Sequence, residues 1–401
     1  MDDIVIIGAG QAGSSLVVKL RNLGFDGAIT LIGAESAPPY QRPPLSKKYL
    51  LGQMDLERLY LRPESFYAEN NIALLTSKTA LSIDRDAKSV DVDGTTIPYS
   101  QLALTTGSAP RTLPAAIGGA LNGVHTVRSL ADVDAMAPAF VEGARILIVG
   151  GGYIGLEAAA VAALSGMTVT LIEMADRILQ RVASPETSAY FRALHTSHGV
   201  DIREQMGLER LTGEDHVTGA ILSDGTELPC DIVIVGIGVT PNVKLAEDAW
   251  ITLDNGIAVD IKGRTSDPFI WAAGDCTSLP YNGVRIRLES VQNAIDQAEC
   301  VAENMLGADK DYVPMPWFWS DQYDTKLQIA GLNTGYDRIV TRGSGAAVSF
   351  WYYCSETLLA VDAMNDARAY MVGKRLIEMG KSPDPAVIAD AEADLKPLLK
   401  A

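Results

Sequence analysis

One glycine-rich motif occurs twice in this chain and limits what the chain can fold into. The segment Ile4–Gly13 (IVIIGAGQAG) recurs as Ile146–Gly155 (ILIVGGGYIG). Each copy is a short apolar run, a turn of closely spaced glycines and the start of a helical pattern. A second apolar run follows each copy, at Ala28–Ile32 and Thr168–Ile172. Strand, glycine turn, helix and strand in this order open a dinucleotide-binding βαβ unit, and two copies in the same context predict two such units.

Further apolar runs extend both units. Leu102–Gly107 and Ile232–Gly238 each end in glycine, and we predict that each is the last strand of its sheet. Phe269–Asp275 ends in Gly-Asp and is predicted to return the chain to the first sheet. Continuous apolar strands are typical of parallel sheets covered on both faces. We therefore predict an α/β fold with two Rossmann-like dinucleotide-binding domains.

The C-terminal part has a different composition. From about Pro314 the chain is rich in aromatic residues, and strand-like runs at Leu327–Ala330 and Ala347–Tyr353 precede helical patterns. We predict a third domain here, of α+β type. The predicted boundaries are 1–112 with 245–313 for the first, discontinuous domain, 113–244 for the second and 314–401 for the third.

The glycines of each motif have separate expected roles. The first allows a tight turn, the second lets the backbone approach a pyrophosphate, and the third lets the helix pack on its strand. The pyrophosphate then lies at the positive end of the helix dipole. These glycines are Gly8, Gly10 and Gly13 in the first unit and Gly150, Gly152 and Gly155 in the second.

An acidic residue at the end of the second strand usually binds the ribose in such a unit. In the second unit this is Glu173, 23 residues after Gly150, and its carboxylate would repel a 2′-phosphate and favour NAD over NADP. Arg177 is the one complication, because it could reach such a phosphate. In the first unit the corresponding position is Gly33, and the nearest acid, Glu35, is a weaker candidate.

Two dinucleotide sites in one chain are most simply explained by FAD in the first and NADH in the second. A flavin accepts hydride as a two-electron unit and can release electrons singly, so it links these two kinds of chemistry.

Charge and the pattern of cysteines and histidines exclude several other classes. Fifty acidic residues against 33 basic ones give a formal net charge of −17, which argues against nucleic acid as a partner. The four cysteines form no C-x-x-C pair and the four histidines no metal or triad pattern, so no metal site is predicted. His195 and His198 are interpreted as one face of a helix.

Three features favour a cytoplasmic protein without membrane contact. Scattered single cysteines suit a reducing compartment. The N-terminus shows no basic segment and no cleavage site of a signal peptide. The longest apolar stretch, Ala158–Leu164, is far too short to span a bilayer.

Several segments together resemble the oxygenase-coupled, NADH-dependent ferredoxin reductases, a group within the glutathione-reductase-like flavoprotein superfamily. The resemblance covers essentially the whole chain. Besides the two glycine motifs, the second of which continues to Glu157 (GGGYIGLE), it is carried by Arg42–Lys47 (RPPLSK), Thr105–Gly107 (TTG), Thr265–Pro268 (TSDP), Gly274-Asp275 and Pro316–Gln322 (PWFWSDQ). RPPLSK and PWFWSDQ are the specific segments, whereas the glycine motifs are shared across the superfamily.

The resemblance implies a role for each site residue. Asp275 matches an aspartate that binds the FAD ribitol, and Trp319 would close the flavin site. Lys47 matches a lysine near the reactive edge of the flavin, with Glu157 as its ion-pair partner at the nicotinamide site. Further residues implied to bind FAD are Ala12, Arg42, Pro44, Ala80, Thr106, Gly107, Arg128, Gly274 and Val291, and those implied to bind NAD are Tyr153 and Ile154.

The resemblance also implies that electrons pass from NADH through FAD to a 2Fe–2S ferredoxin that serves a monooxygenase or dioxygenase. No cysteine precedes Cys230, which excludes the thiol relay of related disulfide reductases, and Cys276 is interpreted as a small buried residue. Candidates for docking an acidic ferredoxin are Arg338, Arg342, Lys374 and Arg375.

Two alternatives stay open at this point. One is an NADH-sensing flavoprotein similar to apoptosis-inducing factor. The other is an NADH dehydrogenase that reduces membrane quinone, against which the acidic segment Asp384–Asp394 argues.

Overall fold

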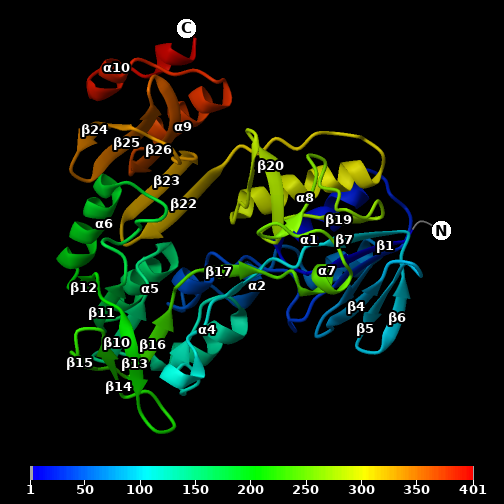
Figure 1. Cartoon of the computed structure of the whole chain (residues 1–401), viewed down its shortest axis with the longest axis horizontal. Coiled ribbons are helices and arrows are strands. Elements are labelled where there is room, and N and C mark those ends of the chain that lie inside the picture. Colours follow the sequence, from blue (N-terminus) through cyan, green and yellow to red (C-terminus); the bar gives the residue numbers. More distant parts are fainter. Residues whose placement is uncertain (1–2, 401) are drawn as a thin grey trace. The chain divides into compact units, whose positions relative to one another are not determined.

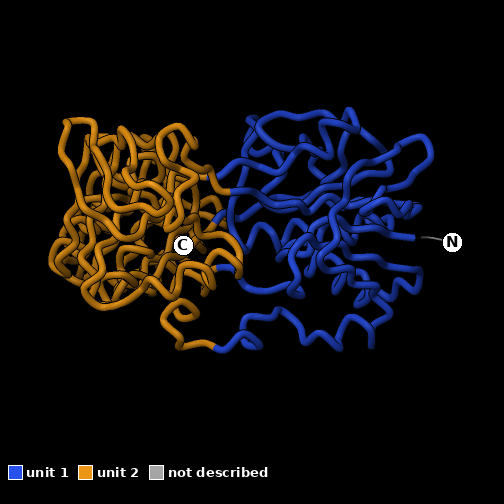
Figure 2. The backbone as a smooth tube through the Cα atoms, turned by 90° about the horizontal axis from the view of Figure 1, so that it is seen from below, with its two compact units in different colours: residues 1–42, 55–109, 239–316 blue, residues 43–54, 110–238, 317–401 orange. Residues whose placement is uncertain are grey.

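The computed structural model describes residues 3–400, and the described chain divides into two compact units (Figure 2). The first consists of residues 3–42, 55–109 and 239–316, and the second of residues 43–54, 110–238 and 317–400. The second unit contains both the second dinucleotide-type sheet and the C-terminal sheet. The three-domain boundaries therefore remain a proposal, and residues 1, 2 and 401 lie outside the described part.

A five-stranded parallel sheet forms the centre of the first unit (Figure 1). Its strand order is β19-β7-β1-β2-β3, with β1 at Ile4–Ile7, β2 at Ile29–Ile32, β3 at Ile72–Leu75, β7 at Gln101–Leu104 and β19 at Ile270–Ala272. All four strand pairs are parallel. Pairing of β19 with β7 confirms that the chain returns to this sheet. The prediction that Leu102–Gly107 is the last strand of this sheet is wrong, because β19 follows β7 in the chain and joins the same sheet.

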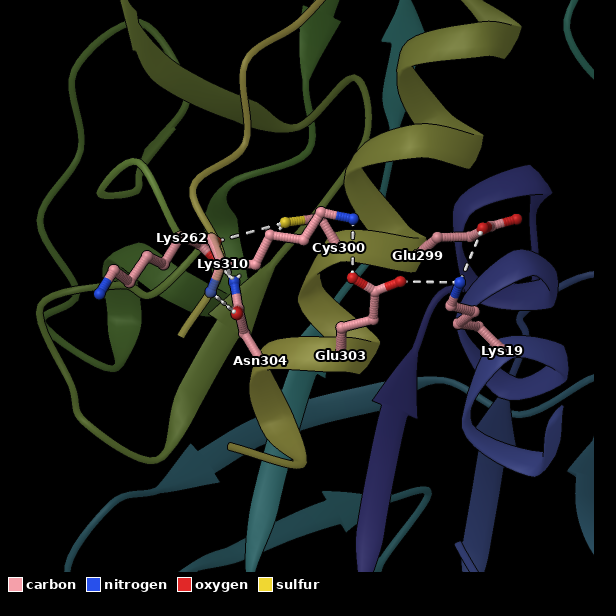
Figure 3. A network of polar contacts seen from close by, with 7 residues as sticks. All are labelled: Lys19, Lys262, Glu299, Cys300, Glu303, Asn304 and Lys310. Atoms are coloured by element: carbon pink, nitrogen blue, oxygen red, sulfur yellow. Dashed lines mark hydrogen bonds and ion pairs between the residues drawn. The ribbon is translucent and has the colours of Figure 1, made fainter. Parts of the chain in front are cut away.

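Two helices pack together in this unit, α1 at Gln11–Asn22 and α8 at Val291–Met305. Their buried faces share an apolar core with β1 and β2. On the outer side, Lys19 of α1 pairs with Glu299 at 3.3 Å and Glu303 at 2.8 Å of α8, and Lys310 pairs with Glu303 at 2.8 Å (Figure 3). Ion pairs that remain partly exposed to solvent, as these do, contribute little stability each, so apolar burial holds the two helices together.

The second unit contains a matching parallel sheet of order β12-β11-β10-β16-β9. Its strands are β9 at Val124–His125, β10 at Arg145–Val149, β11 at Thr168–Glu173, β12 at Asp201–Glu204 and β16 at Ile232–Val235. Strand β16 is the last strand of this sheet in chain order, as predicted for Ile232–Gly238, although the earlier strand β9 pairs outside it. Helix α5 at Tyr153–Leu164 is buried over most of its length, and α6 at Pro185–Ser197 follows β11 in the chain.

The C-terminal part is a five-stranded antiparallel sheet of order β22-β23-β26-β25-β24. The strands are β22 at Trp317–Gln322, β23 at Thr325–Gly331, β24 at Arg338–Ser344, β25 at Ala347–Cys354 and β26 at Thr357–Met364, followed by helices α9 at Ala367–Glu378 and α10 at Pro385–Ala389. Its core contains Trp351, Val361 and Leu376. The predicted fold class, two Rossmann-like parts and a C-terminal α+β part, is confirmed.

Shorter elements complete the described chain. The helices are η1 (a π-helical turn) at Leu45–Tyr49, α2 at Leu56–Leu59, α3 at Glu64–Glu69, α4 at Leu130–Met136 and α7 at Lys244–Asp248, with 3₁₀ turns η2 at Ala115–Ile117, η3 at Ala137–Ala139 and η4 at Lys396–Leu399. The strands are β4 at Ala80–Asp84, β5 at Ser89–Val92, β6 at Thr95–Pro98, β8 at Ser108–Pro110, β13 at Leu208–Thr212, β14 at Gly219–Leu222, β15 at Glu227–Pro229, β17 at Val239–Pro241, β18 at Ile257–Ala258, β20 at Thr277–Tyr281 and β21 at Val284–Ile286. Among residues 3–400 no helix has the length and apolar character needed to cross a membrane.

Candidate functional site

The first and third glycines of both motifs are fixed by steric contacts. Gly8 and Gly150 have φ values of +116° and +109°, which a side chain would strain. A Cβ at Gly13 would lie 2.1 Å from the Gly8 carbonyl oxygen, and a Cβ at Gly155 would lie 2.1 Å from the Gly150 carbonyl oxygen. The helix can therefore approach its strand only when these positions lack a side chain.

The middle glycine of each motif faces open space. A Cβ built at Gly10 or at Gly152 meets no atom of the chain within 4 Å. Each of these residues is the N-cap of the helix that follows, α1 or α5, and neither helix has a capping side chain or an acidic residue in its first turn. Free N–H groups and a positive helix end beside open space are what a pyrophosphate requires. The residues present thus fit two bound dinucleotides.

The acid at the end of β11 is held beside the second turn. Glu173 accepts a hydrogen bond from the Gly151 N–H at 2.7 Å and from the Ala175 N–H at 2.8 Å. A carboxylate has about four acceptor positions, so both oxygens keep capacity for ribose hydroxyls. Arg177 donates to the Ser184 and Ala183 carbonyls at 3.2 and 2.9 Å and is committed to the loop before α6.

In the first unit a glycine, Gly33, stands at the position that Glu173 has in the second unit. A Cβ at Gly33 would lie 2.6 Å from the Cβ of Ala9, so no acid can occupy the position that Glu173 has in the second unit. Glu35, two residues later, pairs with Arg42 at 2.5 Å and accepts a hydrogen bond from the Tyr40 hydroxyl. Its carboxylate is therefore already paired with a guanidinium.

The Thr-Thr-Gly segment and the Gly-Asp segment both lie at the carboxyl ends of strands in the first sheet. Thr105, which follows β7, donates its hydroxyl to the Gly8 carbonyl at 2.8 Å, and Thr106 donates to the Asn242 carbonyl at 2.7 Å. Ser108 donates to Asp275 at 3.2 Å. A Cβ at Gly274 would lie 3.1 Å from that of Ala12, so the Gly-Asp turn packs on the start of α1.

A buried ion pair marks the second unit. Lys47 Nζ lies 2.9 Å from Glu157 Oε1, and the side chains are only 16% and 9% exposed. The same oxygen accepts a hydrogen bond of 2.6 Å from Ser320 of β22. Burial raises the pKa of Glu157, although Lys47 and Ser320 both act to lower it. Lys47 lies in η1 with non-helical backbone angles (φ −132°, ψ −109°).

The remaining site residues are distributed over both units. Val291 opens α8 in the first unit after its N-cap Ser290, and Ala80 is the buried first residue of β4. Pro44, Arg128 and Trp319 belong to the second unit, together with Lys47. Pro44 precedes η1, the Arg128 N–H bonds Asp132 at 3.0 Å, and Trp319 packs on Trp317 with ring centroids 5.5 Å apart.

Two residues of α5 carry further information. Tyr153 packs on Phe318 with ring centroids 4.9 Å apart, and its hydroxyl is buried without a hydrogen-bond partner in the described part of the chain. Ile154, beside it in the first turn, is 43% exposed. An orphaned hydroxyl and an exposed aliphatic side chain at the start of a helix suit a position next to a ligand.

The cysteine and histidine interpretations have different outcomes. Cys276 is fully buried, as expected, and burial raises the pKa of its thiol. His195, interpreted as part of a helix face, is instead fully buried and bonds Gln322, whereas His198 is exposed. Within residues 3–400, no group of three or more His, Cys, Asp or Glu residues could hold a metal ion.

Three polar residues at this site were not identified from the sequence. Ser320 and Gln322 lie in the PWFWSDQ segment, and His195 lies on α6. The spacing of residues along β22 could have indicated Ser320 and Gln322. In a strand these two residues share one face, and Trp317 and Trp319 share the other. The partner of that polar face could not be read from a single sequence.

Comparison with known proteins gives matches over nearly the whole chain. Residues 2–298 match the family described as pyridine nucleotide-disulphide oxidoreductase, and residues 317–399 match the family described as reductase C-terminal. The chain is 43% identical to rhodocoxin reductase of Rhodococcus erythropolis over 401 residues, which covers 98% of this chain and 93% of the relative. It is 41% identical to putidaredoxin reductase CamA of Pseudomonas putida over 411 residues, covering 100% and 97%.

Solved structures agree with the sequence matches. The reductase in the covalent putidaredoxin reductase–putidaredoxin complex superposes with a TM-score of 0.96 at 39% identity, covering 100% of this chain and 98% of that one. The ferredoxin reductase for the CYP199A2 system from Rhodopseudomonas palustris gives 0.95 at 40% identity, covering 99% of both. The chain therefore belongs to the pyridine nucleotide-disulphide oxidoreductase family and, within it, to the putidaredoxin reductase-like ferredoxin reductases.

Proposed function

We propose that this chain is an FAD-dependent NADH:ferredoxin reductase whose electron acceptor is a 2Fe–2S ferredoxin of an oxygenase system. The observation that carries the proposal is the pair of open glycine cradles, at Gly10 and Gly152, in a chain without a cysteine before Cys230. Such a chain can hold two dinucleotides, and it has no thiol pair before Cys230 to receive two electrons. FAD, when bound, accepts hydride from NADH and releases electrons singly.

The residues proposed to hold FAD begin with the first glycine turn, whose N–H groups and helix end face the pyrophosphate. Asp275 and Arg42 supply charged groups in the same unit. The full set proposed for FAD is Gly8, Gly10, Ala12, Gly13, Glu35, Arg42, Pro44, Lys47, Ala80, Thr106, Gly107, Arg128, Gly274, Asp275, Val291 and Trp319. The set proposed for NADH is Gly150, Gly152, Tyr153, Ile154, Gly155, Glu157 and Glu173.

The Lys47–Glu157 pair is proposed to organise the nicotinamide site. A buried carboxylate that lacked its lysine would be strongly disfavoured, so each side chain fixes the other. Lys47 keeps two further N–H donors beyond the one that meets Glu157, and these can bind a polar group of the cofactor. The pair thus supplies an oriented positive group in an environment with little water.

The chain is proposed to act in the cytoplasm. All four cysteines are free, and three of them, Cys230, Cys276 and Cys300, are buried. Unpaired cysteines are typical of a reducing compartment.

Coenzyme choice gives a first prediction. Replacing Glu173 with glutamine should narrow the preference for NADH over NADPH by about tenfold, because the variant loses the charge that repels a 2′-phosphate and weakens the bonds to ribose, which are worth ~1.5–3 kcal/mol when charged. The measurement is kcat/KM for both coenzymes with ferricyanide. Arg177→Ala is the matched control and should leave the ratio unchanged, because Arg177 is committed to backbone carbonyls. Equal kcat/KM for both coenzymes in the unaltered protein would contradict the assignment.

Three of the four basic residues predicted to dock a ferredoxin are already paired within the C-terminal part of the chain. Arg342 is a poor candidate, since its guanidinium donates to the backbone carbonyls of Ile388, Asp390, Ala391 and Ala393 and so anchors the C-terminal segment. Lys374 and Arg375 pair with Glu378 at 3.3 and 3.1 Å. Arg338, exposed on β24, is the candidate that remains.

The second prediction tests the function itself. Anaerobic mixing of the FAD-loaded protein with NADH and a 2Fe–2S ferredoxin should bleach the iron–sulfur absorbance. The rate should fall as salt rises, because ionic screening acts over about 8–10 Å at physiological ionic strength. Ferricyanide reduction in the same salt series is the control and should change much less. If ferredoxins encoded in the same genome were reduced no faster than oxygen, the proposed acceptor would be wrong.

A further inference from the structure

A continuous line of buried polar side chains leads from Glu157 to the protein surface, entirely within the second unit. Glu157 is joined to Ser320 at 2.6 Å, Ser320 to Gln322 at 3.1 Å, and Gln322 to His195 Nε2 at 2.7 Å. His195 Nδ1 lies 3.2 Å from the Tyr323 hydroxyl. Ser320, Gln322 and His195 are each at most 1% exposed. Burying a polar group is unfavourable unless it is hydrogen-bonded. The continuous pairing along this line offsets that cost, so we treat the line as a structural feature in its own right.

The chemistry of the groups gives the line one direction. An ionised Glu157 only accepts, so Ser320 donates its hydroxyl to it and must accept from the Gln322 amide. The Gln322 oxygen then faces the imidazole and requires Nε2–H of His195 as donor. Burial lowers the pKa of His195 to about 4, so the ring is neutral and its Nδ1 accepts from Tyr323. Every hydrogen bond therefore donates toward the carboxylate.

Other charged and titratable groups around the two ends are few. Glu157 faces Lys47 from η1 and, from β22, Ser320 and the charge of Asp321. His195 faces Gln322 and Tyr323 and is influenced by the charge of His198, the C-cap residue of α6, whose ring stacks on that of Tyr323 with centroids 3.7 Å apart. Burial raises the pKa of Glu157 and Asp321 adds to that effect, whereas Lys47 and Ser320 oppose it.

We propose that His195 and Gln322 are positioning residues, which act through Ser320 to hold the carboxylate of Glu157 ionised and oriented toward Lys47. The catalytic consequence rests on the proposed function of the Lys47–Glu157 pair. The line does not serve as a proton path, because the Gln322 amide in its middle can donate and accept but does not exchange its proton as an acid or base. Through these hydrogen bonds, His195 on α6 fixes the orientation of the Glu157 carboxylate at the proposed nicotinamide site and favours its ionised form.

Docking of α6 on the C-terminal sheet does not by itself require this line. A separate buried network already joins the two, in which Thr187 of α6 donates to Asp362 of β26 at 2.7 Å and the Ser184 N–H donates to the Tyr352 hydroxyl at 3.2 Å. Thr187→Val, which removes a buried hydroxyl from the same helix, is therefore a matched control for loss of packing.

The test compares the carboxyl pKa of Glu157 in three variants, read by ¹³C NMR in FAD-loaded protein without NADH. His195→Phe should raise this pKa by about one unit, equivalent to a tenfold change in the ionisation equilibrium. In His195→Gln the amide can replace Nε2–H, so the pKa of Glu157 should stay close to its value in the unaltered protein. Thr187→Val should leave this pKa unchanged. ¹⁵N NMR of the four histidines should show His195 neutral with its proton on Nε2 in the unaltered protein.

Either of two results would overturn the proposal. One is a folded His195→Phe variant whose Glu157 pKa is unchanged or moves no further than in Thr187→Val. The other is a proton on Nδ1 of His195 in the unaltered protein, a result that needs no variant to fold. In addition, as pH is lowered, flavin reduction by NADH should begin to fall at a higher pH in His195→Phe than in the unaltered protein. Failure to reduce any ferredoxin would refute the proposed function while leaving both NMR results as they are.

Discussion

Replacing Gly13 with alanine is expected to give a protein that is purified without FAD. The new Cβ would lie 2.1 Å from the Gly8 carbonyl oxygen and 3.0 Å from the Thr105 hydroxyl, so α1 must move away from β1. Overpacking of this kind costs about 1–3 kcal/mol, and it displaces the helix end that is proposed to face the pyrophosphate. The measurement is flavin absorbance per mole of protein after gel filtration, together with the thermal unfolding midpoint of the FAD-free protein, which should fall.

Gly10→Ala is the matched control, because it adds the same methyl group to the same turn. Gly10 has φ −98°, which alanine adopts freely, and its Cβ meets no chain atom within 4 Å. The FAD-free variant should therefore unfold at the same temperature as the unaltered protein. FAD affinity should still fall about tenfold or more, ~1.4 kcal/mol, because the methyl group enters the space left for the pyrophosphate. A Gly10→Ala protein that bound FAD normally would show that the pyrophosphate lies elsewhere.

The glycine turns could be predicted from the sequence because their requirement is local. Gly8 and Gly13 exclude side chains through contacts within a single turn, and the same contacts recur at Gly150 and Gly155. Such a requirement leaves a fixed spacing in the sequence. The order of elements follows from it, since a strand, a glycine turn and a helix pack in only one way.

The strand positions within each sheet were less accessible. Leu102–Gly107 was expected to be the last strand of its sheet, but β19 follows it in the chain and pairs outside it. Ile232–Gly238 is the last strand of its sheet in chain order, as expected, but the sequence did not predict that β9 pairs outside it. Strand β9 has only two residues, Val124 and His125, and carries no apolar run long enough to be recognised. An edge strand this short is held by its neighbour rather than by its own pattern.

The polar line through His195 shows what a single sequence leaves out. His195 lies between Leu194 and Thr196 and was interpreted as one face of a helix together with His198, which is the C-cap residue of α6 and is exposed. Whether His195 is buried depends on β22, which lies more than 100 residues away in the chain. Long-range pairing of this kind is set by tertiary packing and leaves no local pattern.

Lys47→Met is expected to lower the stability of the protein and to remove most of its NADH-driven flavin reduction. The variant leaves the Glu157 carboxylate, 9% exposed, without its cation, and breaking a buried ion pair in this way costs about 3–5 kcal/mol. Burial already raises the pKa of Glu157, and loss of Lys47 removes the largest opposing effect. When folding raises the pKa of an acidic group, the protein becomes less stable as pH rises through that pKa, because the group must then ionise in its buried position. The deficit of Lys47→Met relative to the unaltered protein should therefore be small at acidic pH and large above neutrality.

The double variant Lys47→Met/Glu157→Gln separates stability from function. It removes both charges, and uncharged replacements of a buried ion pair are often neutral or stabilising, so its unfolding midpoint should return close to that of the unaltered protein and lose the added pH dependence. Flavin reduction by NADH, followed by stopped flow, should remain impaired by at least about tenfold, ~1.4 kcal/mol in the activation free energy. Normal flavin reduction in this stable double variant would mean that the pair only supports the fold. Recovery of stability without recovery of hydride transfer would place Lys47 and Glu157 at the reacting site, because packing alone cannot account for a defect that persists after packing is restored.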